Sequence, residues 1–182
     1  IKEDHSGNIW LGTWSGLFRI KSDMESVVKI FSANVPDLCI LRNGDLFFTA
    51  YGRGIYKIGK NVSCPVCVKI PKRYDTLTKS CVTLFQDAQD RLWLGSYGNG
   101  ALCFQKKNYS LLSTGNGLLS NNALCFQEDA DGRIWISTSR GIARVISTNG
   151  EFNVKNYLKS DGTLGEQFHE KAGCKASDGR IF

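Results

Sequence analysis

The chain has 182 residues, 42% of them hydrophobic and 22% charged, and a formal net charge of +6. This apolar fraction is normal for a globular domain and can build a core. Without a run of 18 apolar residues, the sequence predicts no membrane-spanning helix. Its lysines and arginines are scattered and often alternate with apolar residues, which indicates solvated strand faces rather than a nucleic-acid surface. The short basic cluster at residues 69–73 leaves open a mild attraction for an anionic ligand, such as a sulfated or uronic-acid glycan.

A hairpin pattern recurs along the chain: a polar turn, a β-rich run with an aromatic anchor, a Gly turn and a second run. Its copies cover residues 3–20, 41–58, 86–104 and 128–145, and a truncated fifth copy covers residues 174–182. The aromatic anchors are Trp10, Phe47, Trp93, Trp135 and Phe182. They are spaced by 37, 46, 42 and 47 residues, a period typical of propellers with four strands per unit.

Further β-rich stretches follow the hairpins at residues 26–31, 65–70, 109–113 and 152–157, and others precede them at residues 81–86 and 123–128. No apolar pattern of helical period persists for three turns, so no substantial helix is predicted. We therefore predict an all-β fold in which residues 1–182 form a partial β-propeller of about four four-stranded antiparallel blades. In each blade strand A is innermost, strand B carries the anchor, strand C follows the Gly turn and strand D is outermost.

The repeats resemble the two-component regulator propeller repeat. In the fourth copy the matching residues are Leu119, Ser120, Asn121, Asn122, Glu128, Asp129, Gly132, Trp135, Thr138, Gly141 and Arg144. The turns at residues 51–54 and 97–100 resemble the longer turn variant of this family, and residues 161–182 resemble the start of its last blade. Phe47, Asp90 and Ser137 depart from the pattern, each in a single blade.

This resemblance implies a propeller of about seven blades, of which the chain would be an open arc. Such an arc would expose strand edges and apolar faces, and we expect it to self-associate or dissolve poorly in isolation. The resemblance further implies the periplasmic sensor region of a hybrid two-component histidine kinase from Bacteroides-like bacteria. The intact receptor would be a homodimer attached to the inner membrane by other parts of the chain. It would bind an oligosaccharide and control polysaccharide-utilisation genes.

The seven cysteines are too dilute for a disulfide scaffold, and most lie in apolar strand contexts where a free thiol acts as a small hydrophobe. Cys64 and Cys67 form one C-x-x-C motif. A zinc site would need a second pair of cysteines, and a thioredoxin-type redox motif would need a helix where a strand follows here. Free thiols fit an oxidising compartment poorly, and burial would reconcile the two. The acidic turns are explained by turn geometry and lack calcium-loop spacing. We expect no metal and no cofactor.

Catalytic residues are not predicted, because His5 and His169 have no partner motif and no nucleophile or phosphate-loop motif is present. The anchors Trp10, Phe47, Trp93 and Trp135 occupy a repeated position, which is typical of packing between blades. We interpret them as structural.

The turns between strands B and C vary chemically while their frame repeats, and they open on the same propeller face as the connections between strand D and the next strand A. Aromatic rings with planar hydrogen-bonding groups suit sugars, so this face is the predicted ligand site. Its turn residues are Trp14, Tyr51, Arg53, Tyr97, Asn99 and Arg140, and its connection residues are Asn121, Asn122, Glu166, Gln167 and His169. Alternatively, the aromatics pack on the neighbouring turn and Asn122 forms a turn.

Three functions stay open from the sequence. The first is a ligand-sensing propeller of a transmembrane kinase. The second is a propeller for protein association or dimerisation without a small ligand. The third is a propeller enzyme that acts on polysaccharide, although two carboxylates cannot be placed at a catalytic separation from sequence. Oligosaccharide binding separates the first from the second, and turnover of that ligand would favour the third.

Overall fold

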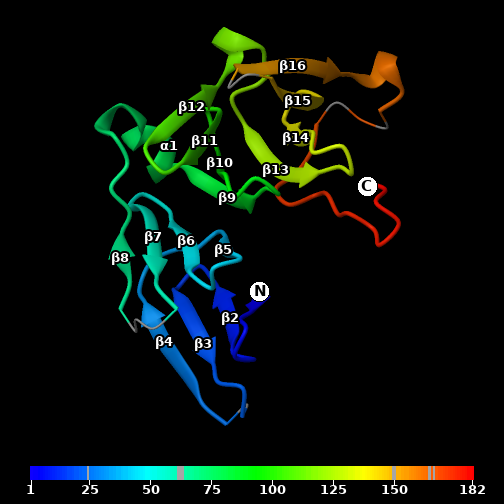
Figure 1. The fold of residues 1–182 in the computed structure, drawn as a ribbon. Helices are drawn as coiled ribbons and strands as arrows, with labels where there is room; N and C mark the ends of the chain where they lie inside the picture. The colour runs from blue at the N-terminus through cyan, green and yellow to red at the C-terminus, as the bar shows by residue number, and fades with distance from the viewer. Residues whose placement is uncertain (24, 61–63, 149–150, 164, 166) are drawn as a thin grey trace. The chain divides into compact units, whose positions relative to one another are not determined.

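The computed structural model describes residues 1–23, 25–60, 64–148, 151–163, 165 and 167–182. Its strands form four antiparallel sheets of four strands each, and in every sheet neighbouring strands follow one another in the chain (Figure 1). The predicted all-β fold of four-stranded antiparallel blades is therefore confirmed. The chain divides into two compact units, Ile1–Leu84 and Phe85–Phe182. Within the described residues, no helix has both the length and the apolar character needed to cross a membrane.

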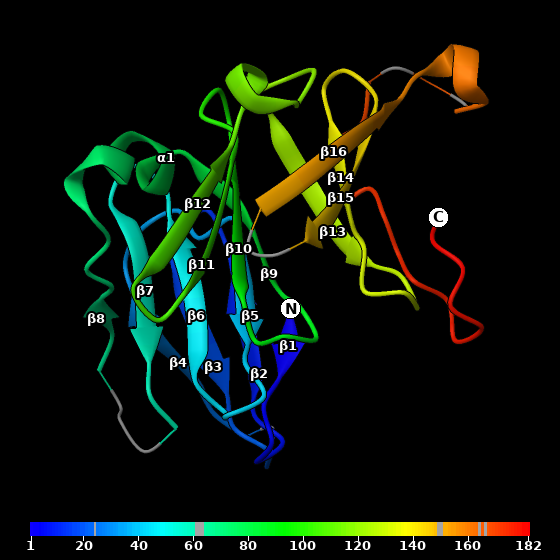
Figure 2. The ribbon, with the colours of Figure 1, turned by 45° about the horizontal axis from the view of Figure 1, so that its top comes forward.

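The unit Ile1–Leu84 holds the first two blades. The first consists of β1 (Lys2–Glu3), β2 (Ile9–Gly12), β3 (Leu17–Ile20) and β4 (Val27–Phe31). The second consists of β5 (Leu38–Ile40), β6 (Leu46–Ala50), β7 (Gly54–Ile58) and β8 (Val66–Cys67). The strand predicted at residues 65–70 is thus only two residues long. It is followed by the 3-10 turn η1 (Lys72–Tyr74) and the helix α1 (Asp75–Lys79), which the sequence did not predict (Figure 2).

Aromatic side chains join the two blades of this unit. The ring of Phe31 lies 4.6 Å from Tyr56 and 5.2 Å from Phe48, measured between ring centroids. Phe48 is fully buried, and Trp10 belongs to the same core cluster. Each such ring pair stabilises the fold by about 0.5–1.5 kcal/mol beyond the burial of its area. Trp10 is thus buried in the core of this unit.

The unit Phe85–Phe182 holds the other two blades, with β9 beginning in the first unit. One blade consists of β9 (Cys81–Gln86), β10 (Leu92–Ser96), β11 (Ala101–Gln105) and β12 (Asn108–Leu112). The other consists of β13 (Ala123–Glu128), β14 (Ile134–Thr138), β15 (Ile142–Thr148) and β16 (Glu151–Tyr157), and η2 (Thr114–Asn116) and η3 (Lys159–Asp161) are short 3-10 turns. The ring of Trp93 is buried 5.9 Å from Phe126 and 5.1 Å from Phe152. The anchor of one blade thus packs on strands of the next.

Each tryptophan anchor also has a fixed polar partner. Its indole N–H donates to the Oδ2 of an aspartate six residues earlier, in the turn before strand B. The pairs are Trp10 with Asp4 at 2.8 Å, Trp93 with Asp87 at 2.8 Å and Trp135 with Asp129 at 2.7 Å. These aspartates also accept backbone N–H groups of their own turns. From the sequence alone, turn geometry explains these aspartates. In the structure they also hold the tryptophan anchors.

The two phenylalanine anchors lack this partner. Six residues before Phe47 the chain has Leu41, and six residues before Phe182 it has Ala176. A phenyl ring carries no donor, so a buried carboxylate at that position would lose one of the hydrogen bonds that offset its desolvation. The identity of the anchor and the identity of the turn residue are thus coupled across the five repeats.

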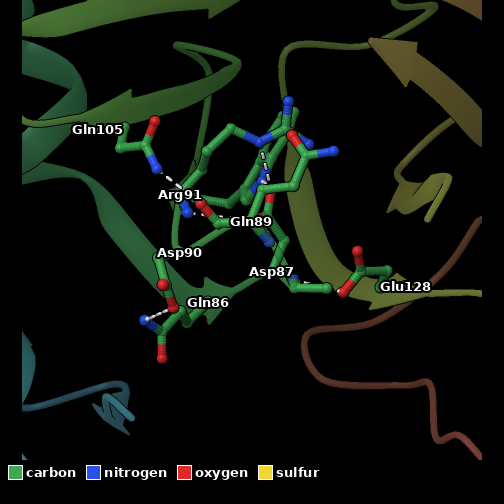
Figure 3. Close-up of polar contacts among 9 residues, drawn as sticks. Gln86, Asp87, Gln89, Asp90, Arg91, Gln105 and Glu128 are labelled. Carbon is green, nitrogen blue, oxygen red and sulfur yellow. Dashed lines mark hydrogen bonds and ion pairs between the residues drawn. The ribbon is translucent and has the colours of Figure 1, made fainter. Parts of the chain in front are cut away.

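Figure 3 shows the polar contacts of the turn between β9 and β10, where Asp90 replaces the usual glycine. Asp90 has φ +61°, in the left-handed region that Gly7, Gly44 and Gly132 occupy in other blades. Its Oδ1 accepts a hydrogen bond from Gln86 Nε2 at 3.0 Å. Aspartate tolerates this conformation better than most residues, although glycine adopts it without steric strain.

In three of the four blades, the glycine that ends the turn between strands B and C lies against the outer strand or its end. A Cβ atom on Gly16, Gly100 or Gly141 would stand 2.2, 2.1 or 2.5 Å from a backbone carbonyl oxygen. Those oxygens belong to Phe31, Leu112 and Tyr157. No side chain fits at such distances, so this glycine sets how closely the outer strand or its end approaches the turn.

Candidate functional site

Three of the predicted site residues meet in one pocket of the unit Phe85–Phe182. Tyr97, Asn122 and His169 line a pocket of about 320 Å³. They come from three separate segments: the turn between β10 and β11, the connection that precedes β13, and the segment after η3. Leu124, Ser139, Phe168 and Glu170 complete the lining. The pocket thus joins turns and connections as the sequence predicted for a ligand face.

The turn that carries Tyr97 is held in place by its own hydrogen bonds. The hydroxyl of Ser96 donates to the carbonyl of Gly100 at 2.8 Å. Asn99 Nδ2 donates to the carbonyl of Tyr97 at 3.0 Å, which turns the amide back onto the loop. Gly98 has φ +75°, and no atom lies within 4 Å of where a Cβ would be. Glycine is therefore favoured there by the backbone conformation and not by a lack of space. This frame leaves the Tyr97 side chain 40% exposed at the mouth of the pocket.

Asn122 links the turns of two neighbouring blades. Its Oδ1 accepts the backbone N–H of Gly98 at 2.7 Å, and its Nδ2 donates to Ser139 Oγ at 3.1 Å. Ser139 Oγ also lies 2.7 Å from Ser120 Oγ. Asn122 is therefore a structural bridge that also forms a wall of the pocket. Both hydrogen bonds of its side chain go to other turns of the chain.

Another wall of the pocket is a segment that runs beside β13 and β14. Backbone hydrogen bonds from Phe168 to Thr138 and from Lys171 to Leu124 fasten it, at 3.3 and 3.1 Å. Between these points His169 is exposed. The hydroxyl of Tyr97 is hydrogen-bonded to the carboxylate of Glu170, which joins this wall to the opposite one. Gln167 is exposed beside it, and Glu166 lies outside the described residues.

The other predicted residues lie outside this pocket. Asn99 and Arg140 belong to the same unit but are not part of the lining. Trp14, Tyr51 and Arg53 belong to the unit Ile1–Leu84. Trp14 is 88% exposed and Tyr51 is 47% exposed.

Leu124, Ser139, Phe168 and Glu170 line the pocket without having been selected as site residues from the sequence. A partial signal was available for Ser139, which precedes Arg140 in a turn of the predicted face, and for Glu170, which follows His169. Phe168 and Leu124 look like ordinary apolar residues, and only the path of the segment after η3 places them here.

A larger cavity of about 420 Å³ lies in the same unit and is mainly apolar. Its walls include Trp135, Ile142, Phe168, Ile181 and Phe182. Trp135 is the anchor of its blade, and the equivalent Trp93 is covered by aromatic rings of the next blade. This cavity therefore corresponds to packing space between repeats, and we do not assign a ligand to it.

The seven cysteines form no disulfide in the structure and differ in their degree of exposure. Cys81, Cys103 and Cys125 are buried, and burial raises the pKa of Cys103 to about 12. Cys64, Cys67 and Cys174 are exposed and Cys39 is half-buried. Burial therefore reconciles only part of the thiol content with an oxidising compartment, contrary to the sequence-based expectation. The described residues contain no group of three or more His, Cys, Asp or Glu side chains able to hold a metal ion.

Four-stranded sheets in chain order, with anchors packed from one sheet to the next, define this chain as a set of β-propeller blades. Residues 117–140 match the family model of the two component regulator propeller. This is the segment on which the sequence resemblance mainly rested, and the resemblance is confirmed there. Comparison with curated proteins gives no match.

Several solved structures share the fold. The extracellular domain of BT3049 from B. thetaiotaomicron, assigned as a hybrid two component system, has a TM-score of 0.82 at 21% identity, over 99% of this chain and 25% of that one. The corresponding domain of BT4673 from the same organism has a TM-score of 0.79 at 16% identity, over 99% of this chain and 27% of that one. Virginiamycin B lyase from Staphylococcus aureus has a TM-score of 0.69 at 14% identity, over 100% of this chain and 67% of that one. The chain thus spans about a quarter of the length of the first two.

Proposed function

We propose that this chain is part of the ligand-sensing propeller of a hybrid two-component sensor histidine kinase. In this proposal the propeller lies in the periplasm, as the ectodomain of a homodimeric inner-membrane receptor. Binding of an oligosaccharide is relayed across the membrane and controls polysaccharide-utilisation genes. The family repeat at residues 117–140 and the likeness to extracellular domains of two hybrid two component systems support this assignment.

The observation that carries the proposal is the pocket between Tyr97 and Glu170. It combines a half-exposed aromatic ring with amide, hydroxyl, imidazole and carboxylate groups from separate segments. Sugars present apolar ring faces together with hydroxyl donors and acceptors, and such a ligand needs a few convergent polar groups beside a stacking surface. Asn122 and Ser139 are already fixed by hydrogen bonds, so part of this wall is preorganised before a ligand arrives.

Calorimetric titration of the intact protein with a panel of oligosaccharides tests the proposal, with Tyr97→Ala as the central variant. We expect Tyr97→Ala to weaken binding about tenfold or more, because a stacking ring and the contact to Glu170 are lost together. Arg140→Ala is the matched control: its turn is adjacent, but it lies outside the pocket lining. We expect its affinity to stay within about twofold of the wild type.

The outcomes separate the alternatives. Equal losses in both variants would contradict the pocket as the binding site. A protein that binds none of the oligosaccharides yet dimerises would support the association propeller instead. Conversion of a bound oligosaccharide into products would support the enzyme. Thermal unfolding of each variant shows whether a loss of binding reflects a loss of folded protein.

A further inference from the structure

The net charge of the chain is concentrated in one short region. Residues 51–80 contain seven lysines and arginines and a single acidic residue, Asp75, so this region carries a net charge of +6. That value equals the charge of the whole chain, and the remaining residues therefore have no net charge. Along the sequence the lysines and arginines look scattered, but the net positive charge is concentrated in residues 51–80.

Five of these cations lie around one turn and one connection of the β5–β8 blade. Arg53 ends the turn before β7, and Lys69, Lys72, Arg73 and Lys79 lie on the connection through η1 and α1 (Figure 2). All five are exposed. We refer to this group as the basic surface.

The connection is docked on the turn by its apolar side. Tyr74 and Leu77 are buried, and the backbone N–H of Gly52 donates to the carbonyl of Lys79 at 2.8 Å. This hydrogen bond places the end of α1 beside the turn that carries Tyr51 and Arg53. The fold therefore turns the apolar residues of the connection inward and brings its cations to the same end of the blade as Arg53.

Little of this positive charge is neutralised within the region. Lys79 Nζ lies 2.7 Å from Asp75 Oδ2, in a pair whose two side chains are about half exposed. Arg73 places its guanidinium 4.9 Å from the ring centroid of Tyr74. Asp75 is the one carboxylate among the described residues of 51–80. A cluster of exposed cations with a single counter-charge creates a positive potential that attracts anions.

We infer that the basic surface binds a polyanionic oligosaccharide, sulfated or rich in uronic acid. Sulfate and carboxylate groups match guanidinium and ammonium donors, and the half-exposed ring of Tyr51 offers a sugar face to stack on. An anionic membrane surface is a poorer match, because Tyr74 and Leu77, two large apolar side chains of the connection, are buried and do not point outward to insert. The inference rests on the proposed function and adds the charge class of the ligand.

The test compares two triple variants of the intact protein that lose the same charge. One variant carries Arg53→Ser, Lys72→Ser and Arg73→Ser on the basic surface. The control carries Lys21→Ser, Lys107→Ser and Lys159→Ser, three exposed lysines outside the region 51–80. The probes are a heparin-derived hexasaccharide, its chemically desulfated counterpart, and vesicles that contain anionic phospholipid. Binding is measured by calorimetry and by vesicle co-sedimentation at low and at physiological salt.

We expect the basic-surface variant to bind the sulfated hexasaccharide about tenfold or more weakly, while the control stays within about twofold of the wild type. The affinity of the wild type should fall as salt screens the surface charges, and the desulfated probe should bind far more weakly. Equal losses in the two variants would overturn the inference, because net charge alone would then account for binding.

Two further outcomes would also overturn it. Vesicles that bind as tightly as the hexasaccharide, with the same loss in the basic-surface variant, would assign the surface to anionic lipid. Neutral oligosaccharides that bind normally to the basic-surface variant, with no binding of the sulfated probe, would reject the anionic ligand and leave the proposed sensor function intact. Absence of binding to every oligosaccharide would instead reject the proposed function itself.

Discussion

The indole N–H of Trp93 donates to Oδ2 of Asp87 at 2.8 Å, and both side chains are fully buried. The same oxygen accepts the guanidinium Nε of Arg91 at 2.6 Å (Figure 3). Backbone N–H groups of Gln89 and Arg91 donate to the other carboxylate oxygen, Oδ1. A buried carboxylate tolerates desolvation only when it is paired and hydrogen-bonded, and this one is.

Asp87→Ala should therefore be strongly destabilising. The variant leaves the indole and the guanidinium without their buried acceptor, and we expect the free energy of unfolding to fall by about 3–5 kcal/mol. Urea denaturation followed by tryptophan fluorescence measures the change. Asp178→Ala is the matched control, because its ion pair with Arg180 is at least half exposed on both sides and should contribute under about 1 kcal/mol. Similar losses in both variants would contradict the structural role of Asp87.

The equivalent carboxylates make stability depend on pH in the acid range. Burial acts to raise the pKa of Asp129, but hydrogen bonds from Trp135, Arg133 and the backbone outweigh it and hold the pKa below its ordinary value. A lowered folded-state pKa stabilises the fold above the unfolded pKa of about 4, and that contribution disappears as pH falls through the folded pKa. We expect the free energy of unfolding to decline below about pH 4, with a shallower decline in Asp129→Asn. Urea titrations at stepped pH check this, and identical slopes would refute it.

Replacing Asp90 with glycine should stabilise the protein. The residue has φ +61°, and glycine removes the steric strain of that conformation while it gives up the exposed hydrogen bond to Gln86. We expect a gain of up to about 1 kcal/mol, read as a higher urea midpoint. The reciprocal variant Gly132→Ala has φ +74°, and its added methyl group would stand 3.9 Å from Glu128 Oε1, an ordinary contact without a clash. It should lose about 1 kcal/mol, so a gain in both variants would exclude backbone conformation as the cause.

Thiol reactivity should divide the cysteines by exposure. Burial raises the pKa of Cys103 to about 12, which leaves almost no reactive thiolate at pH 8. Cys64, Cys67 and Cys174 are exposed and should alkylate rapidly with iodoacetamide in the folded protein. Mass spectrometry of digested samples identifies the labelled sites. Labelling of Cys103 at the rate of Cys174 before denaturation would contradict the buried placement.

The repeat made most of the fold predictable from sequence. Strand B and strand C positions follow from the anchor and from the Gly turn, and the inner strands Cys81–Gln86 and Ala123–Glu128 have the bounds that were predicted. The helix α1 escaped prediction because its five residues are too few for a helical period to show. Tertiary packing holds this helix in place, because Tyr74 and Leu77 of the connection are buried.

The candidate site was less predictable, because its geometry depends on which connection reaches which turn. The sequence pointed to Tyr97, Asn122 and His169, and the structure places them in one pocket. It could not show that Asn122 accepts the N–H of Gly98, since 24 residues separate them. Nor could it show that Glu170 contacts Tyr97, because this contact requires the segment after η3 to run beside the β13–β16 blade. Long-range contacts of this kind carry no local sequence signal.

The glycine that ends each turn between strands B and C has a consequence for engineering. At Gly100 and Gly141 a carbonyl oxygen of the outer strand occupies the space of a side chain, so these positions cannot be varied. The residues just before them, such as Tyr97 and Arg140, are exposed and lie outside the blade ladder. A combinatorial library that keeps this glycine and Gly98, and randomises exposed turn positions such as Tyr97 and Arg140, would alter what the surface binds at little cost in folding. Each blade then acts as a separate, exchangeable carrier of a short recognition loop.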